Sequence, residues 1–183
     1  MPRADQPHTP EVELAARHAY AGGGGTSVIL TPDLQAFCQS GISVIVAASS
    51  RGEAPVACIG CGCRILPDGR MRLLLPRAGN EALLAIVRRG GRFAATFSQP
   101  LTHRSIQVKG SHATVGIMGE EDRQHAIRQT RGLCRELIEI GHSADFANAY
   151  CDLTNGELVA IDIVLTVAFV QTPGPGAGAE LKA

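Results

Sequence analysis

Three largely apolar segments, the first of them rich in β-branched residues, follow one another with only a few residues between them. We expect strands over residues 42–50, 55–66 and 70–75. The first two are separated by Arg51-Gly52-Glu53-Ala54, and the last two by the strong turn sequence Pro67-Asp68-Gly69. Parallel neighbours would need crossovers of roughly a dozen residues, and these connections are much shorter. The spacing therefore predicts an antiparallel sheet or barrel.

The remaining elements place helices around that sheet. Further strands are expected over residues 27–30, 92–98, 103–109 and 157–171, with residues 111–118 as another strand or a bent extension past Gly110. Helices are expected over residues 9–20, 31–39, 81–89, 120–140 and 144–151. The order predicts a mainly β fold, a small barrel with peripheral helices. Its parts are an N-terminal arm with a short helix and a Gly-rich joint (1–25), the domain (26–172) and a Gly/Pro-rich tail (173–183).

Composition narrows the class of protein. Lys and Arg together number 17, as do Asp and Glu, so a broad basic face for nucleic acid is not expected. Aromatic residues make up 4% of the chain and Trp is missing, so the core must be aliphatic. No apolar run approaches the roughly 18 residues of a membrane span, and the start has no apolar signal region. We expect a cytoplasmic protein whose six cysteines are free thiols.

The sequence Arg77-Ala78-Gly79-Asn80 stands between a strand and a helix. The N–H groups and positive dipole of a helix start attract anions, and the Arg77 guanidinium fits phosphate. Gly79 allows a ligand to approach the backbone. The segment is a candidate phosphate site, with an ordinary solvated cap as the alternative.

The sequence Cys58-Ile59-Gly60-Cys61-Gly62-Cys63 suggests a metal or redox site. Zinc sites usually need four ligands, and no second Cys or His pair follows at a regular spacing. We therefore favour small buried thiols over a metal centre. Gly60 and Gly62 remove side chains from one face of the strand, so a flat ligand could lie against its backbone.

Polar side chains alternate along the strand expected at residues 103–109. His103, Ser105, Gln107 and Lys109 fall on one face because successive strand residues point to opposite sides. Such groups suit a heteroaromatic ring with carbonyl and imide edges, although a solvated edge strand is the alternative. Together with the two preceding features, they predict a pocket for a phosphorylated flat heterocycle.

These motifs resemble one known family, the pyridoxamine 5'-phosphate oxidase-like FMN-binding split barrels. The similarity is best over residues 31–116. It rests on Pro-x-x-x-x-Gly-Cys-Gly-Cys-Arg from Pro55, Pro-Asp-Gly at residues 67–69, Leu-Leu-Pro-Arg ending at Arg77, and residues 100–110. The chain lacks the Arg-x-x-Arg-Leu-type C-terminal segment of the true oxidase, and Ala78 replaces a second basic residue after Arg77. Its tail at residues 171–178 resembles an uncharacterised branch of the family.

The resemblance implies a six-stranded antiparallel split β-barrel of the FMN-binding type and a homodimer with two FMN at its interface. It also implies roles for particular residues. The backbone of Cys61, Gly62 and Cys63 would line the isoalloxazine ring. The phosphate would be held by Arg77 and the helix start near Asn80, and the ring would be reached by Ser105 and Gln107 with Lys109 nearby.

The leading hypothesis is an FMN-binding flavoprotein, an oxidoreductase with a small-molecule substrate, in which the cofactor carries the electron transfer. One alternative is a non-enzymatic flavin or haem carrier or sensor on the same scaffold. Another is a metal or redox sensor that uses Cys58, Cys61 and Cys63. No catalytic residue is assigned, and His103 is the only candidate acid or base.

Overall fold

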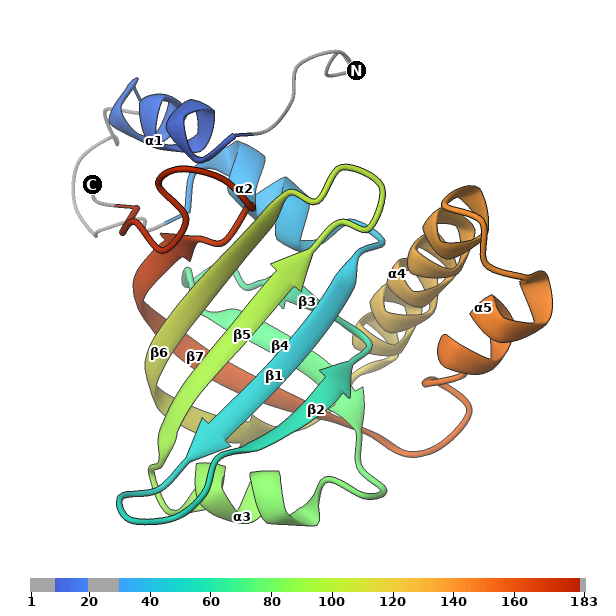
Figure 1. Cartoon of the computed structure of the whole chain (residues 1–183). Helices are drawn as coiled ribbons and strands as arrows, with labels where there is room; N and C mark the ends of the chain where they lie inside the picture. The colour runs from blue at the N-terminus through green and yellow to red at the C-terminus, as the bar shows by residue number, and fades with distance from the viewer. Residues whose placement is uncertain (1–8, 20–29, 182–183) are drawn as a thin grey trace.

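A seven-stranded sheet organises the protein. The computed structural model describes residues 9–19 and 30–181. Every strand pair is antiparallel, the order is β2-β1-β5-β6-β7-β4-β3, and the sheet curls into a split barrel with helices around it (Figure 1). The predicted mainly β architecture is confirmed, with seven strands instead of six. The strand expected at residues 27–30 falls outside the described residues except for Leu30, which lies in a bend.

The elements follow the predicted order closely. The helices are α1 (Pro10–Ala19), α2 (Pro32–Cys38), α3 (Glu81–Arg88), α4 (Glu120–Glu139) and α5 (Ala144–Tyr150). The strands are β1 (Ser43–Ser49), β2 (Val56–Gly60), β3 (Gly62–Ile65), β4 (Met71–Pro76), β5 (Arg92–Ser98), β6 (Ser105–Gly116) and β7 (Leu158–Val170). The Thr-Pro sequence before α2 acts as expected, because the Thr31 hydroxyl accepts the Leu34 N–H at 3.2 Å.

The strand expected over residues 55–66 is in fact two strands at opposite edges of the sheet. β2 pairs with β1, whereas β3 pairs with β4. The chain crosses between the edges at Cys61, whose N–H donates to the Leu74 carbonyl at 2.7 Å. Gly62 has φ 144°, which ends the continuous extended backbone. This break brings the two edges together and accounts for the additional strand.

β6 begins two residues later than expected and continues past Gly110, which was one of the two alternatives for residues 111–118. His103 is exposed in the preceding turn with φ 59°, so its predicted place in the polar row of the strand is wrong. At the other end, residues 111–116 extend the same strand. The pairing with β7 shifts between Lys109 and Gly110, and a Cβ on Gly110 would lie 2.7 Å from the Val164 carbonyl oxygen. The predicted bend at Gly110 is therefore a close backbone approach that requires glycine.

The inner face of the curled sheet carries the core. Inward side chains alternate along the strands, as Val44, Val46 and Ala48 do in β1. Phe37, Phe93 and Phe97 are the aromatic members of the core formed by the described residues, so the predicted aliphatic core is confirmed. α3 lies at one end of the barrel and α2 at the other (Figure 1).

The C-terminal segment turns back onto the sheet. The Gly178 N–H donates to the Val170 carbonyl at 2.7 Å, and the Leu181 N–H donates to the Ala168 carbonyl at 2.8 Å. Leu181 is buried in the main core. Of the Gly/Pro-rich tail expected at residues 173–183, the described part, residues 173–181, forms a loop that returns the apolar side chain of Leu181 to the barrel. Among the described helices, none combines the length and apolarity needed to cross a membrane.

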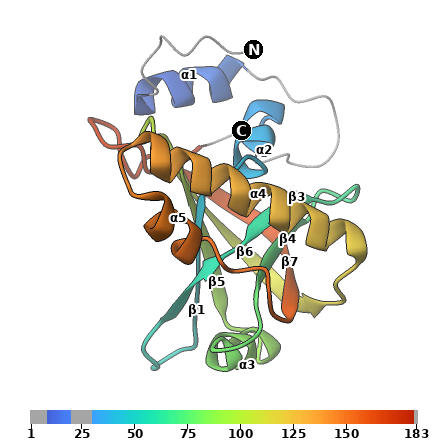
Figure 2. The same ribbon diagram turned by 90° about the vertical axis from the view of Figure 1, so that its right-hand side faces the viewer.

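α4 crosses the outside of the barrel and contacts β3 (Figure 2). Gly132 of α4 lies against Gly41 in the turn before β1. A Cβ on Gly132 would lie 2.5 Å from the Gly41 Cα. Both glycines are needed because backbone meets backbone at this crossing.

We predict that Gly132→Ala destabilises the protein by about 1–3 kcal/mol, because the added methyl group forces the helix away from Gly41. Alanine favours a helix interior over glycine by about 1 kcal/mol, so the same change in an uncrowded helix would stabilise. Urea unfolding measures the difference. Arg131→Ala, at the exposed neighbouring position, is the control and should change the unfolding free energy by less than about 0.5 kcal/mol. A more stable Gly132→Ala variant would contradict the close crossing.

Candidate functional site

The outer face of the curled sheet is largely apolar. Opposed residues from neighbouring strands form two rows across it. One row is Ile59, Ile45, Thr96, Gln107 and Phe169, and the next is Ala57, Ala47, Ala94, Lys109 and Val167. In Figure 1 the outer face of β1, β5 and β6 is turned toward the viewer, and none of the described helices covers it there. We refer to these ten residues as the outer face.

Gln107 and Lys109 are the main polar groups of the outer face. The Gln107 amide donates to the Thr96 hydroxyl at 3.1 Å, and its side-chain oxygen is a second polar group that can accept a hydrogen bond. The Lys109 ammonium lies 4.7 Å from the centre of the Phe169 ring. Both side chains therefore present polar atoms beside small apolar ones.

Ser105 has a different environment. Its side chain is buried, and its hydroxyl is 2.6 Å from the Ser98 hydroxyl and 3.0 Å from the Phe97 carbonyl. It shares a face with Gln107 and Lys109 as predicted, but its hydroxyl already has partners within the chain.

A hollow of about 220 Å³ opens beside Lys109. Arg92 adds a second cation. Ala47 and Ala94 also line the hollow, and their side chains are too small to fill it. The rest of the wall comprises Ala48, Ser49, Pro55 and Phe93. A flat ring with a nearby anionic group matches this combination of small apolar side chains and two cations.

Arg77 and Asn80 lie elsewhere, where β4 meets α3. The Arg77 guanidinium donates to the Glu157 carboxylate at 2.7 Å, and the Asn80 amide donates to the Pro76 carbonyl at 2.8 Å. Arg77 and Arg123 line a hollow of about 510 Å³ with Gly116, Ile117, Met118, Gly119, Glu120, Glu157, Leu158 and Val159. Two arginines beside glycine backbone suit an anion, but the Arg77 charge is matched by Glu157.

Cys61, Gly62 and Cys63 lie beneath α4. The Gln129 amide bridges the backbone of Cys63, accepting from its N–H at 2.9 Å and donating to its carbonyl at 2.7 Å. A Cβ on Gly62 would be 2.4 Å from the Gln129 side-chain oxygen, and a Cβ on Gly60 would meet Val44. The two glycines thus allow close packing between elements, which corrects the interpretation of a bare surface for a flat ligand.

The thiols of this segment are poorly suited to thiolate chemistry. Burial raises the pKa of Cys58 to about 11. Burial, with the neighbouring Cys58, raises the pKa of Cys61 to about 12, and burial raises that of Cys63 further. Within the described part of the chain, no group of three His, Cys, Asp or Glu side chains could hold a metal ion. These findings disfavour the metal or redox sensor based on Cys58, Cys61 and Cys63.

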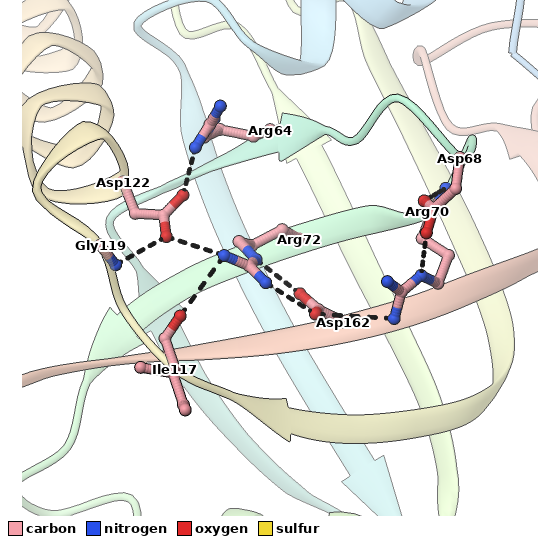
Figure 3. A network of polar contacts seen from close by, with 8 residues as sticks. All are labelled: Arg64, Asp68, Arg70, Arg72, Ile117, Gly119, Asp122 and Asp162. Carbon is pink, nitrogen blue, oxygen red and sulfur yellow. Dashed lines mark hydrogen bonds and ion pairs between the residues drawn. The ribbon is translucent and has the colours of Figure 1, made fainter.

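A cluster of ion pairs joins β3, β4, β7 and α4 (Figure 3). Arg72 donates to Asp162 through two nitrogens at 2.7 and 2.9 Å and to Asp122 at 2.9 Å. Asp122 also accepts from Arg64 at 2.6 Å and from the Gly119 N–H at 3.0 Å. Burial opposes the charge of Asp122, but these hydrogen bonds lower its pKa below the ordinary value. The arginine and aspartate charges of the cluster are paired with one another, so the cluster stabilises the packing of α4 against the barrel.

Sequence analysis missed this cluster, although a signal was present. Arg72 is the one charge within an apolar strand, and Asp162 is the one charge within another. Isolated opposite charges in two buried strands are rarely tolerated unless paired. Their pairing could have indicated that β4 and β7 are neighbours.

The eight predicted cofactor-binding residues therefore occupy three regions of one chain. Gln107 and Lys109 lie on the outer face with Ser105 buried beside them, Cys61–Cys63 lie under α4, and Arg77 and Asn80 lie at the start of α3. The register places Pro76 opposite Leu158 and Lys109 opposite Val167. These pairs are separated by roughly 30 Å along β7. Arg77 and Lys109 line separate hollows.

No family model matches the sequence, and no curated protein matches it. The solved structures that resemble the chain include pyridoxamine 5'-phosphate oxidase-like proteins. HupZ of Group A Streptococcus is 13% identical over 82% of this chain and 98% of its own, with a TM-score of 0.49. A protein described as a putative pyridoxamine 5'-phosphate oxidase from Lactobacillus delbrueckii is 12% identical over 79% and 96%, with a TM-score of 0.46. General stress protein 26 from Bacillus anthracis is 13% identical over 76% and 91%, with a TM-score of 0.40.

We predict that Arg72→Ala lowers the unfolding free energy by about 3–5 kcal/mol at pH 7, because it leaves two buried carboxylates without their shared partner. The stabilisation carried by the low pKa of Asp122 is present above its unfolded value of about 3.9 and is lost as the pH falls through the lower folded value. The penalty of Arg72→Ala should therefore shrink in acid.

Denaturant unfolding at several pH values measures this effect. The control is Arg70→Ala, since Arg70 is more exposed and lies 3.7 Å from Asp162. Its cost should stay below about 1 kcal/mol. Equal penalties for the two variants would show that Arg72 does not hold the cluster.

Proposed function

We propose that the protein is a cytoplasmic FMN-binding flavoprotein, an oxidoreductase for a small-molecule substrate, that acts as a homodimer. The observation that carries the proposal is the outer face. An uncovered sheet of alanine, isoleucine and valine side chains surrounds one amide and one ammonium group. That combination supports both a flat heteroaromatic ligand and a second protein chain.

The residues present fit the chemistry of FMN. Small side chains such as Ala47 and Ala94 leave room for a flat ring, and the Gln107 amide offers a donor and an acceptor for its polar edge. Lys109 and Arg92 supply positive charge near the hollow. Bound FMN would supply the electron or hydride transfer. The chain's own part would be to hold the ring, match its polar edge and exclude water.

A homodimer accounts for the separation of the predicted residues. Within one chain, Arg77 and Lys109 line different hollows. If the outer faces of two chains meet, the flavin at their interface could contact Gln107 and Lys109 of one chain and the Arg77 region of the other. The separation of these groups is then expected for a site shared between two copies.

We predict that purified protein is yellow or becomes so on titration with FMN. Gln107→Ala and Arg77→Ala should each raise the dissociation constant about tenfold, the first through the ring and the second through the phosphate. Quenching of FMN fluorescence measures binding, and Thr114→Ala, an exposed change further along β6, is the control. Protein that stays colourless after FMN titration would refute flavin binding. If both variants bind FMN as tightly as the unmodified protein, the flavin pocket must lie on other strands.

The same preparation distinguishes the alternatives. A Soret band in place of a flavin spectrum would identify a haem carrier, and His103 would then be the first residue to replace. Oxidation of NAD(P)H by the FMN-loaded protein would argue for an oxidoreductase. Bound FMN without any turnover would favour a carrier or sensor.

We predict that Ile45→Glu converts the dimer to a monomer. Ile45 is 38% exposed in the middle of the outer face, so a charge there would be buried against the second copy. Ile138→Glu is the matched control, since Ile138 is 44% exposed on α4, away from the sheet. Light scattering coupled to size exclusion measures the mass. The interface would be refuted if the unmodified protein is a monomer. It would also be refuted if Ile138→Glu disrupts the dimer and Ile45→Glu does not.

A further inference from the structure

A second hollow, of about 700 Å³, lies between α4 and α5, away from the outer face. Figure 2 shows α5 packed beside α4, and the two helices share a small apolar cluster of Leu133, Leu137 and Ala147. Two cysteines pack against this cluster and line the hollow, Cys134 from α4 and Cys151 at the end of α5. The hollow gives small molecules access to both sulfur atoms.

The two cysteines lie close to each other. The Cys134 thiol donates to the Asn148 side-chain oxygen at 3.3 Å, and Cys151 follows Asn148 by three residues at the end of α5, so it lies on the same side of that helix. Both side chains are half-buried, unlike Cys61 and Cys63, which are buried under α4. Nothing in the spacing of these cysteines along the sequence indicates this pairing. Packing of α5 against α4 produces it.

We propose that Cys134 and Cys151 form a reversible disulfide within one chain, with a low-molecular-weight disulfide such as oxidised glutathione as the oxidant. One protein thiolate attacks a glutathione sulfur, and the first glutathione leaves as its thiolate. The second protein thiolate then attacks the mixed disulfide and releases the second glutathione. Two protein thiols are oxidised, one glutathione disulfide is reduced to two thiols, and two protons pass to solvent or to the leaving thiolates.

The surroundings suit a slow, reversible pair. Burial, together with the adjacent Cys134, raises the pKa of Cys151 to about 11, so exchange at this thiol is slow near neutral pH. The open hollow that both residues line, and not a low pKa, distinguishes this pair from the buried Cys61 and Cys63. Arg123 and Arg131 line the same hollow and favour a thiolate once it forms. Asp152, also in the wall, acts in the opposite direction.

The disulfide would constrain the segment that follows α5. In the reduced chain this segment is held by hydrogen bonds, with Arg123 donating to the Thr154 carbonyl at 2.9 Å and to the Gly156 carbonyl at 3.1 Å. The next residue, Glu157, pairs with Arg77. Oxidation would covalently join the end of α5 to α4 and so fix the start of this connection. The proposal is independent of flavin binding.

Mass spectrometry after oxidation tests the proposal directly. The full-length protein is incubated with oxidised glutathione, alkylated and cut with trypsin without reduction. Cleavage after Arg131, Arg135 and Lys182 places the two cysteines on peptides 132–135 and 136–182. We expect these peptides to be joined, with a mass lower by two hydrogen atoms than their sum, and to separate on reduction. The oxidised protein should also melt several degrees higher.

Three variants define the outcome. Cys134→Ser and Cys151→Ser should each abolish the linked peptide and the rise in melting temperature. Cys58→Ser removes a thiol from another part of the barrel and should leave both unchanged. The proposal is overturned if the peptides remain separate while other thiols are oxidised, or if the link joins two chains instead of one. Loss of the link in Cys58→Ser would overturn it as well.

Discussion

The guanidinium of Arg72 is the group on which the arrangement of this protein depends. It lies on β4 and is shared by Asp162 of β7 and Asp122 at the start of α4. Three elements distant in sequence therefore depend on one charge. The planar guanidinium group carries several N–H donors and can bind two carboxylates at once. The single ammonium group of a lysine could not bind both with this geometry. With α4 held in this way, its far end reaches Gly41 and α5.

The position of α4 has consequences on both of its sides. Beneath the helix, Gln129 packs against Gly62 and hydrogen-bonds to the backbone of Cys63, in the cysteine-rich connection between β2 and β3. Above it, α5 packs onto the exposed side of the helix and brings Cys134 to Cys151. The chain thus has thiols buried beneath α4 and one pair of half-buried cysteines that line an open hollow. None of the described helices packs on the outer face.

Much of the fold could be predicted from local chemistry. Thr-Pro sequences begin helices, short turns enforce antiparallel neighbours, and period-two alternation separates Gln107 and Lys109 from Ile106 and Val108. Glycine inside a helix is costly, so Gly132 within the predicted helix 120–140 is a local signal of close packing. Sequence reasoning failed at residues 55–66, since a continuous apolar run does not reveal that its two halves pair with opposite edges of a sheet.

The sequence by itself determined the elements, their order and the alternation of faces, because these follow from backbone sterics and side-chain polarity over a few residues. It also determined that an amide and an ammonium share one face of β6. Only the tertiary structure decided that Gly62 packs against Gln129, that Arg77 lies far from Lys109 along β7, and that Cys134 and Cys151 line the same hollow. Each of these depends on contacts between residues distant in sequence, and closure of the barrel and docking of α4 bring those residues together.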